Sequence, residues 1–326
     1  MTWHLINMKN TARGGAQKIL DAIKTPSDIV FSQDMHSEIN HLSKPRIFLK
    51  ILSSLINSKP ERIVIHTRYF LVLAPITTAL GIRTIFYCHA SYRKQNYLFK
   101  VFKCNGYICV SNSARRILES SGVAKNKIKV VPNPLLSSGK PNFIKDDHNA
   151  SAIISVGSLA PWKGYHEALS HLAHYSGPIN YKIIGEGSCE QELKRLAMTL
   201  PSNIKVEFLG RLATPYEHST YAPIVLIPSL EEGFGLVAIE AIYNGRILLY
   251  SDIPALKEIC ESDPLSIPFD VSSSSSFITA LDQAISLSNQ TLDRKSITER
   301  SLKTQEKYNL KNFIDNYKST INSTFN

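Results

Sequence analysis

The stretch IPSLEEGFGLVAIEAIYNGR, residues 227–246, joins the end of a strand, a loop with two glycines and a helix-length segment that stops at Gly245. The helical part is apolar, yet Glu240 lies in its middle and Glu232 lies at its start. Burial of an unpaired carboxylate among alanine and isoleucine side chains is costly. Glu240 therefore either faces water or contacts a ligand.

Strand–loop–helix units of this kind recur along the chain. Strand-like apolar runs lie at residues 3–8, 62–66, 83–89, 106–111 and 127–133, and again at 152–158, 180–187, 205–211, 224–229, 246–252 and 265–269. Near-continuous apolar strands separated by helix-length segments are typical of parallel sheets that are covered on both faces. The pattern predicts an α/β protein with two doubly wound, Rossmann-like domains.

The boundary between the predicted domains falls in residues 133–151, which are rich in Pro, Ser, Asn and charge and lack periodicity. We predict an N-terminal domain of residues 1–140, a linker of residues 141–150 and a second domain of residues 151–305. Residues 306–326 have a helical pattern. We expect this last helix to pack back on one of the domains, preferably the N-terminal one.

Charge is unevenly distributed between the two halves of the chain. Residues 1–150 contain 22 Lys and Arg against 8 Asp and Glu, a net charge of +14, whereas the remaining residues contain 15 basic and 19 acidic side chains, a net charge of −4. This asymmetry indicates two domains with different partners. The basic half is expected to meet nucleic acid, phospholipid or a phosphorylated acceptor, unless its charge serves only solubility.

The sequence also bears on the compartment of the protein. No apolar run approaches the roughly 20 residues of a membrane-spanning helix, and the first residues read as a strand and not as a signal peptide. The five cysteines are scattered and form no CxxC pair. This pattern is typical of reduced thiols and unfavourable for a zinc site, so we expect a cytoplasmic protein.

Ligands of doubly wound folds bind where strands end at their carboxyl side. Residues 10–17, NTARGGAQ, follow the first strand, and Gly14 and Gly15 let an anion approach the backbone at a helix start. Such turns are common, so this signal is weak alone. The run IGEGSCE has Glu190 where a dinucleotide fingerprint needs its third glycine, which argues against a nicotinamide or flavin site.

The seven residues between Glu232 and Glu240, the EGFG loop and the small-residue helix resemble the signature of retaining glycosyltransferases of the family-four type, which have the GT-B fold of two facing Rossmann-like domains. The resemblance extends over most of the chain. Further motifs in the family's order are NTARGGAQ (10–17), YCHAS (87–91), CVSNSARRIL (109–118), KIKVVPNPL (127–135), VGSLAPWKG (156–164), IIGEGSCEQELKRLA (183–197) and VEFLGRL (206–212).

The resemblance implies a nucleotide sugar, such as a UDP- or GDP-sugar, as donor and no further cofactor. It also implies that Glu232 accepts a hydrogen bond from a hydroxyl of the donor sugar and that Glu240 accepts from the ribose hydroxyls. A carboxylate suits both roles because it only accepts hydrogen bonds. The alternatives are a solvent-facing helix position for Glu240 and a helix-start acid for Glu232.

Negative charge grows on the departing nucleoside diphosphate and needs a metal ion or fixed donors to stabilise it. We see no credible acidic metal site, because Asp146 and Asp147 lie in the predicted linker. By resemblance, the diphosphate contacts Lys163 and the backbone N–H groups of Phe234, Gly235 and Leu236. The alternative for Lys163 is an ordinary surface lysine.

One position departs from the family pattern. The family often has an arginine in the loop before the lysine, and Ser158 occupies that position here and supplies no charge. Arg13 and Arg211 are candidates to replace it, and the alternative is that Lys163 acts with the helix dipoles alone. The residues that we assign to nucleotide and phosphate binding besides Glu240 and the 234–236 backbone are Gly14, Gly15, Gly210 and Arg211.

His89 ends a strand in the N-terminal half, where the family often has a histidine near the reacting sugar. We expect it to bind the donor sugar or to assist removal of the acceptor's proton. A purely structural role fits the sequence almost as well. His66 ends the neighbouring predicted strand and is a weaker candidate of the same kind.

The resemblance implies a retaining glycosyltransferase, and we expect it to be metal-independent. The expected acceptor is a glycan, preferably a lipid-linked oligosaccharide or polysaccharide intermediate of cell-surface glycan synthesis. A lipopolysaccharide and a soluble sugar are the other acceptors that fit the sequence. Retention by double displacement needs a nucleophile under the sugar, and none is apparent, so a front-face reaction is favoured. The alternatives are a nucleic-acid-binding protein, in view of the pI near 9.3, and a catalytically inactive sugar-binding homologue, in view of Ser158.

Two basic segments, residues 44–57 and 93–103, are predicted to be amphipathic helices. The predicted core-facing residues are Ile47, Phe48, Ile51, Leu52, Leu55 and Ile56 in the first and Tyr97, Leu98, Val101 and Phe102 in the second. Phe99 falls outside the second face, among lysines. Exposed aromatic and basic residues suit an anionic membrane surface, so we expect weak peripheral binding. The alternative is that both helices simply cover the sheet.

Overall fold

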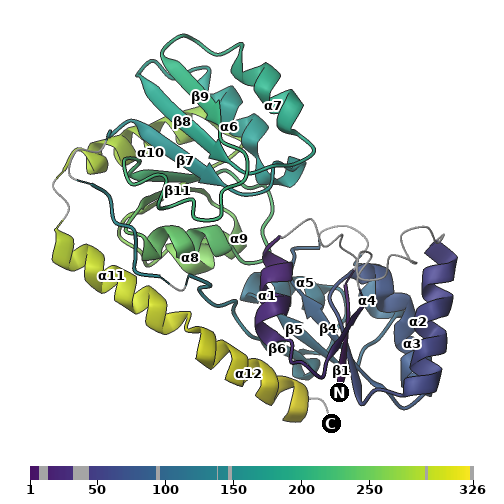
Figure 1. The fold of residues 1–326 in the computed structure, drawn as a ribbon. Helices are drawn as coiled ribbons and strands as arrows, with labels where there is room; N and C mark the ends of the chain where they lie inside the picture. The colour runs from purple at the N-terminus through teal and green to yellow at the C-terminus, as the bar shows by residue number, and fades with distance from the viewer. Residues whose placement is uncertain are drawn as a thin grey trace. The chain divides into compact units, whose positions relative to one another are not determined.

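The structure, a computed structural model, describes residues 1–6, 14–31, 44–92, 96–137, 139–145, 149–290 and 293–323. The chain forms two compact units, Met1–Asn133 with Leu310–Asn326, and Pro134–Asn309. Each unit contains one six-stranded sheet with helices between the strands (Figure 1). The predicted class, α/β with two doubly wound domains, is confirmed.

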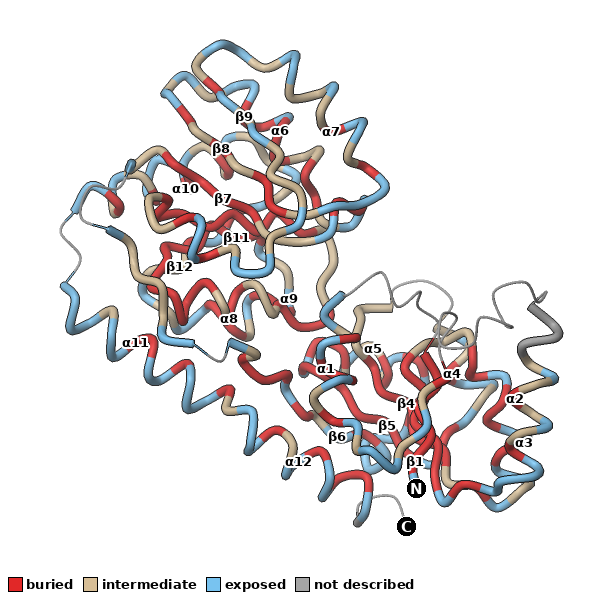
Figure 2. The backbone as a smooth tube through the Cα atoms, viewed as in Figure 1, coloured by how far each residue is buried: buried red, intermediate tan, exposed pale blue. Residues whose placement is uncertain are grey.

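The sheet of the first unit is entirely parallel and has the order β2-β1-β3-β4-β5-β6. Its four inner strands are buried along most of their length, as expected for a sheet covered on both faces (Figure 2). The order reverses between β1 and β3, where such folds bind ligands. The strands are β1 (Thr2–Leu5), β2 (Ile29–Phe31), β3 (Arg62–Ile65), β4 (Arg83–Cys88), β5 (Gly106–Cys109) and β6 (Ile128–Val130).

Helices of the first unit lie between its strands, and some of them begin with a side-chain cap. The Ser111 hydroxyl, for example, accepts a hydrogen bond from the amide of Ala114 and caps α5. The helical segments are α1 (Gly15–Ile23), α2 (Lys44–Ser58), η1 (Arg68–Leu73), α3 (Ala74–Ala79), α4 (Tyr97–Val101), α5 (Asn112–Ser120) and η2 (Lys125–Lys127). The C-terminal helix α12 (Leu310–Ser323) belongs to the same unit, where it contacts α1 and where Arg62 donates to the Ile321 carbonyl.

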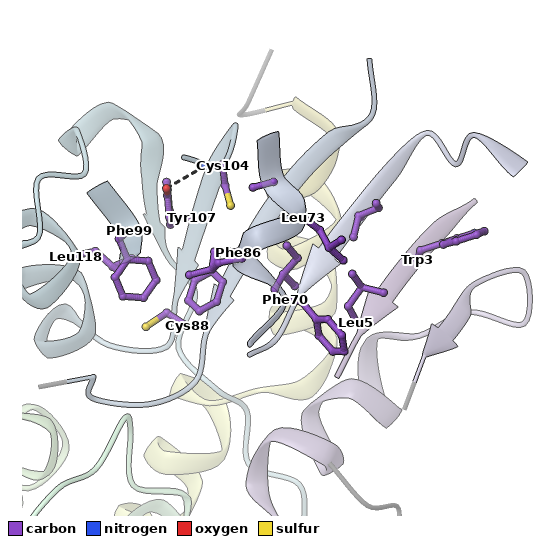
Figure 3. Close-up of a cluster of buried hydrophobic side chains, with 14 of the residues drawn as sticks. Trp3, Leu5, Phe70, Leu73, Phe86, Cys88, Phe99, Cys104, Tyr107 and Leu118 are labelled. Carbon is purple, nitrogen blue, oxygen red and sulfur yellow. Dashed lines mark hydrogen bonds between the residues drawn. The ribbon is translucent and has the colours of Figure 1, made fainter. Parts of the chain in front are cut away.

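Aromatic side chains form much of the core of the first unit (Figure 3). Phe99 is only 1% exposed and packs edge-on against Phe86, with ring centroids 5.1 Å apart. The prediction that Phe99 faces outward is therefore wrong. Tyr97 and Val101, which were expected in the core, are 62% and 61% exposed. The helix α4 has only five residues, too few for apolar periodicity to identify its buried face.

Helix α2 follows its prediction more closely. Ile51 and Leu55 are fully buried, and Phe48 packs against the same core. Ile56 is half-exposed and does not belong to the buried face, contrary to expectation. The side chain of Ile47 lies outside the described residues.

The second unit repeats the architecture with the strand order β12-β11-β10-β7-β8-β9, again entirely parallel. Its strands are β7 (Ala152–Val156), β8 (Ile179–Ile184), β9 (Ile204–Phe208), β10 (Ile224–Ile227), β11 (Ile247–Ser251) and β12 (Ser266–Phe269). Its helical segments are η3 (Pro161–Lys163), α6 (Tyr165–Leu172), α7 (Glu190–Ala197), α8 (Leu236–Tyr243), α9 (Pro254–Cys260), α10 (Ser274–Ser288) and α11 (Arg294–Lys307). The order reverses between β10 and β7.

The chain passes from the first unit to the second at Asn133–Pro134 and returns at Asn309–Leu310. Part of the segment predicted as a linker pairs with the second unit. The amide of Lys145 donates to the Thr220 carbonyl at 3.0 Å, and the amide of Asn149 donates to the Tyr221 carbonyl at 3.1 Å. The observed division therefore lies earlier in the sequence than residues 141–150.

All five cysteines are free and buried. Burial raises the pKa of Cys104 and of Cys260 to about 12, so these two remain neutral thiols at physiological pH. None of the described helices combines the length and the apolar character that a membrane crossing requires.

Candidate functional site

Two loops of the second unit leave the carboxyl ends of adjacent strands. The first follows β7 and runs through η3, and the second follows β10 and leads into α8. Because the strand order reverses between these two strands, their loops lie at the topological switch point of the sheet. Ligands of open α/β sheets bind at this point.

The two loops are joined by backbone contacts. The Trp162 carbonyl accepts hydrogen bonds from the amides of Leu230 and Glu231, at 2.8 and 3.3 Å. Gly164 has a φ of +67°, and a Cβ there would lie 1.8 Å from the Pro228 carbonyl oxygen. Only glycine fits so close a contact in this conformation. Glycine at this position thus lets η3, with Lys163, lie against the second loop.

Lys163 and Glu232 meet across these loops as an ion pair. The Lys163 Nζ lies 2.5 Å from the Glu232 Oε1, and the two side chains are 18% and 14% exposed. The Ser229 hydroxyl donates to the same Oε1 at 2.9 Å. Lys163 and Glu232 are both predicted site residues, but their contact and the role of Ser229 were not predicted from the sequence. A polar residue three positions before Glu232 was the available signal for Ser229.

Helix α8 begins directly after this pair. Its N-cap is Gly235, with a φ of +117° and no side-chain cap, and Leu236 is its first residue. A Cβ on Gly235 would lie 2.7 Å from the Leu256 Cδ2. Phe234 is buried and its ring packs edge-on against Tyr308. The first N–H groups of a helix have no partner within the helix, so this end offers donors to an anion.

Glu240 lies in α8, two turns beyond Glu232, and is half-buried. Its neighbour is the buried Tyr216, whose pKa is raised by burial, with the Glu240 carboxylate adding to the shift. The hydroxyl of Tyr216 donates to the Val237 carbonyl at 3.3 Å. Glu240 is therefore neither fully exposed nor enclosed in the apolar core.

Gly210 and Arg211 follow β9 at the edge of the same sheet. Gly210 has a φ of +64°, and its carbonyl accepts from the amide of Gly185 at 2.7 Å, which joins the loop after β9 to the end of β8. Arg211 is exposed. Ser158 is also exposed, in the loop after β7. These positions agree with a strand-end location.

The remaining predicted site residues lie in the first unit or outside the described residues. Gly14 is the N-cap of α1, Gly15 is its first residue, and both are exposed at the helix start. The Gly14 carbonyl accepts from the amide of Gln17 at 3.1 Å. The predicted residues outside the described part are Arg13, Asp146 and Asp147.

His89 follows β4 in the first unit and contacts His66, which follows β3. The His66 Nδ1 lies 2.8 Å from the His89 Nε2, and the two rings stack with centroids 5.1 Å apart. These two residues were predicted to end neighbouring strands, and the pairing of β3 with β4 confirms this. A third histidine, His4 in β1, extends the contact and was not predicted, because a histidine inside a short strand gave no signal of its own.

Within the described residues, one group has side chains suited to a metal ion: His166, Cys189 and Glu192, whose ligand atoms all lie within 4.8 Å of one another. The His166 Nε2 and the Glu192 Oε1 are 3.2 Å apart, which is also the geometry of a simple ion pair. Glu192 is largely exposed. Metal independence thus stays a prediction.

Two protein families match the chain, each over a different part of it. Glycosyl transferases group 1 matches residues 140–303, and Glycosyltransferase Family 4 matches residues 25–135. The O-antigen chain mannosyltransferase RfbU of Salmonella typhimurium LT2 is 28% identical over 244 residues, which cover 72% of this chain and 68% of that protein. The O-antigen biosynthesis glycosyltransferase WclY of Escherichia coli is 27% identical over 155 residues, 47% of this chain and 43% of that protein.

Solved structures share the fold at low sequence identity. Anabaena Alr3699/HepE in complex with UDP-glucose has a TM-score of 0.80 at 16% identity, over 99% of this chain and 100% of that one. The lipopolysaccharide outer core galactosyltransferase WaaB, in its apo form, has a TM-score of 0.71 at 15% identity, over 98% of this chain and 99% of that one. With two parallel six-stranded sheets and a group 1 match over half of its length, the chain belongs to the group 1 glycosyl transferases, of the GT-B fold and family-four type.

Proposed function

We propose that the chain is a retaining, metal-independent glycosyltransferase that moves a sugar from a nucleoside-diphosphate sugar to a glycan acceptor. The observation that carries this proposal is the Lys163–Glu232 pair, next to the uncapped start of α8 at the topological switch point. A fixed cation and fixed N–H dipoles stabilise the charge that grows on a departing diphosphate, without a metal ion.

The geometry of the pair assigns a different task to each partner. An ammonium group has three N–H donors, and Glu232 accepts from one of them. The other two N–H donors of Lys163 suit two phosphate oxygens of the nucleoside-diphosphate sugar. Lys163 and Ser229 both contact the Oε1 of Glu232, so we assign the second carboxylate oxygen, Oε2, to a hydroxyl of the donor sugar. Lys163 thereby links the sugar-binding carboxylate to the leaving group.

We assign the ribose hydroxyls of the nucleotide to Glu240, which lies on the same helix beyond the phosphate-facing start. We expect Glu240→Gln to weaken UDP or GDP binding by roughly 1.5–3 kcal/mol, because a charged acceptor of hydrogen bonds is lost. The measurement is nucleotide affinity by calorimetry, with the melting temperature as a check on folding. Glu299→Gln, an exposed position on α11, is the matched control. Unchanged affinity in Glu240→Gln refutes the assignment.

We propose a lipid-linked or lipopolysaccharide glycan as acceptor, because relatives and structural neighbours carry O-antigen and lipopolysaccharide names. A screen of UDP- and GDP-sugars with such glycans tests the reaction. We expect transfer from one class of donor, with the anomeric configuration of the donor kept in the product by NMR. Nucleotide binding without transfer from any donor would instead favour an inactive sugar-binding homologue, and inversion would refute the retaining mechanism.

We further propose that the first unit binds the anionic cytoplasmic face of a membrane. The surface of α4 and the residues after it carries two exposed apolar side chains, Tyr97 and Val101, beside the exposed Lys100 and Lys103. Such a combination suits a lipid headgroup region. Residues 1–150 carry a net charge of +14, which adds long-range attraction.

Binding to vesicles tests this surface. We expect co-sedimentation with anionic vesicles at low salt, little with neutral vesicles, and a marked loss in Lys100→Glu with Lys103→Glu, because each basic residue near an anionic leaflet contributes about 1 kcal/mol. The control is Lys205→Glu with Lys303→Glu, the same charge change on exposed positions of the second unit. Equal recovery in the supernatant with both vesicle types at low salt contradicts membrane binding.

A further inference from the structure

Three histidines form a continuous chain inside the first unit: His4 lies in β1, and His66 and His89 directly follow the next two strands of the sheet, β3 and β4. The His4 Nδ1 lies 3.0 Å from the His66 Nε2, and the His66 Nδ1 lies 2.8 Å from the His89 Nε2. His4 and His66 are buried and His89 is half-buried. The two nitrogens at the ends, the His4 Nε2 and the His89 Nδ1, are buried and have no hydrogen-bond partner among the described residues.

A carboxylate stands at one end of this chain. The Asp28 Oδ2 lies 3.9 Å from the His4 Nε2. Asp28 is held in place by the amides of Thr2 and Thr25, at 3.0 and 2.9 Å, and by the Thr25 hydroxyl at 2.8 Å. Burial acts to raise the pKa of Asp28, but these hydrogen bonds outweigh it and lower the pKa, so Asp28 stays charged.

The histidines are neutral at physiological pH. Burial lowers the pKa of His89 to about 3. Burial also lowers the pKa of His4 to about 4, although the negative charge of Asp28 acts to raise it. Burial, together with the two neighbouring rings, also holds the pKa of His66 well below its usual value. Each neutral ring carries one N–H and one unprotonated nitrogen.

Counting protons leaves only two arrangements. Three neutral rings have three N–H groups, and two of these are used in the two contacts. His66 has a single N–H, so it donates in one contact and accepts in the other. The third N–H therefore lies at one end of the chain, on the His4 Nε2 or on the His89 Nδ1. A lone pair on the His4 Nε2 would be repelled by the nearby Asp28 carboxylate, whereas an N–H there is attracted to it. The arrangement with the third N–H on the His4 Nε2 is therefore favoured.

We propose that Asp28, acting through His4 and His66, keeps neutral His89 in the form that is protonated on Nε2 and bare on Nδ1. Asp28, His4 and His66 are then positioning residues. His89 follows β4 at the carboxyl edge of the sheet, where doubly wound folds bind their ligands. A buried acceptor without a partner requires an explanation, and a ligand hydroxyl supplies one.

The consequence for the reaction is a choice between the two roles expected of His89. With its pKa near 3, His89 is a poor base at neutral pH, so it accepts a hydrogen bond from a sugar hydroxyl and does not remove the acceptor's proton. This last step rests on the proposed glycosyltransferase function. The tautomer itself does not, because it follows from the chain of side chains alone.

The tautomer is measured directly by two-bond ¹⁵N–¹H correlation spectra of protein labelled with ¹⁵N-histidine, at neutral pH and without substrate. His89→Gln identifies the His89 resonances by difference. We expect His4, His66 and His89 all to be neutral and protonated on Nε2. A His89 that carries its proton on Nδ1 overturns the proposal. If the expected tautomer is found and no sugar is transferred, the proposed glycosyltransferase function is refuted and the tautomer proposal stands.

Two variants test whether Asp28 is the cause. Asp28→Asn removes the charge, and His4→Leu removes the link to it. In both we expect the share of His89 protonated on Nδ1 to rise at least tenfold. The matched control is Asp21→Asn, an exposed residue of α1 whose partner is Lys24, which leaves the tautomer unchanged. If either variant folds and His89 keeps its wild-type tautomer, the positioning role is refuted.

Discussion

Replacement of Lys163 by alanine is expected to lower the turnover number roughly 10²–10³-fold, the usual cost of removing one fixed donor to a developing charge. The loss should fall on turnover more than on affinity for the sugar nucleotide, because the charge on the leaving diphosphate is largest in the transition state. Lys163 is well placed for this effect, since it is mostly buried and held by Glu232 at the switch point. The measurement is kcat and KM for the variant, with donor affinity measured separately.

Lys182→Ala provides the matched control for this variant. Lys182 also pairs with a glutamate, Glu207 at 3.1 Å, in the same unit but on neighbouring strands away from the two loops. We expect its turnover to match the wild type. Wild-type turnover should also persist in excess EDTA. Loss of activity in EDTA that a divalent ion restores would contradict metal independence and direct attention to the cluster of His166, Cys189 and Glu192. A Lys163→Ala protein that loses affinity as much as turnover would contradict the leaving-group role.

The fold was largely predictable because nearly every strand is an apolar run flanked by loops. The strand that was missed, β2, shows the limit of this signal. It has three residues, Ile29–Phe31, of which only Phe31 is buried. So short an edge strand has no detectable period. The wrong prediction of the buried face of α4 has the same cause. Phe99 is buried because it contacts Phe86 and the rest of the core, and a helix of five residues is too short for a regular apolar pattern to show this.

The site was predictable as separate pieces and not as an arrangement. Lys163 and Glu232 are 69 positions apart, and only the parallel pairing of β7 with β10 brings their loops together. The glycines that permit this approach were visible, but the oxygen that Gly164 faces was not. Asp28 could not be predicted from the sequence for a similar reason, because it acts on His89 only through the rings of His4 and His66.

Acid should destabilise the first unit well before its carboxylates are protonated. His4 has a folded-state pKa of about 4 and an unfolded value near 6.5. Between these values the unfolded state binds about one more proton than the folded state, so stability falls as the pH decreases. At pH 5 the loss from His4 is roughly 2 kcal/mol relative to neutral pH. The pKa values of His66 and His89 are lowered as well, so both act in the same direction.

The measurement is the free energy of unfolding between pH 7 and pH 4.5, from urea titrations that follow the first unit through the fluorescence of the buried Trp3. Trp162 of the second unit is first replaced by Phe to leave Trp3 as the sole tryptophan. His4→Gln, which takes up no proton, should reduce the slope of stability against pH by about one proton, or 1.4 kcal/mol per pH unit. The exposed His218→Gln of the second unit should leave it unchanged. A wild-type slope in His4→Gln would show that His4 is already protonated in the folded protein, contrary to a neutral histidine chain.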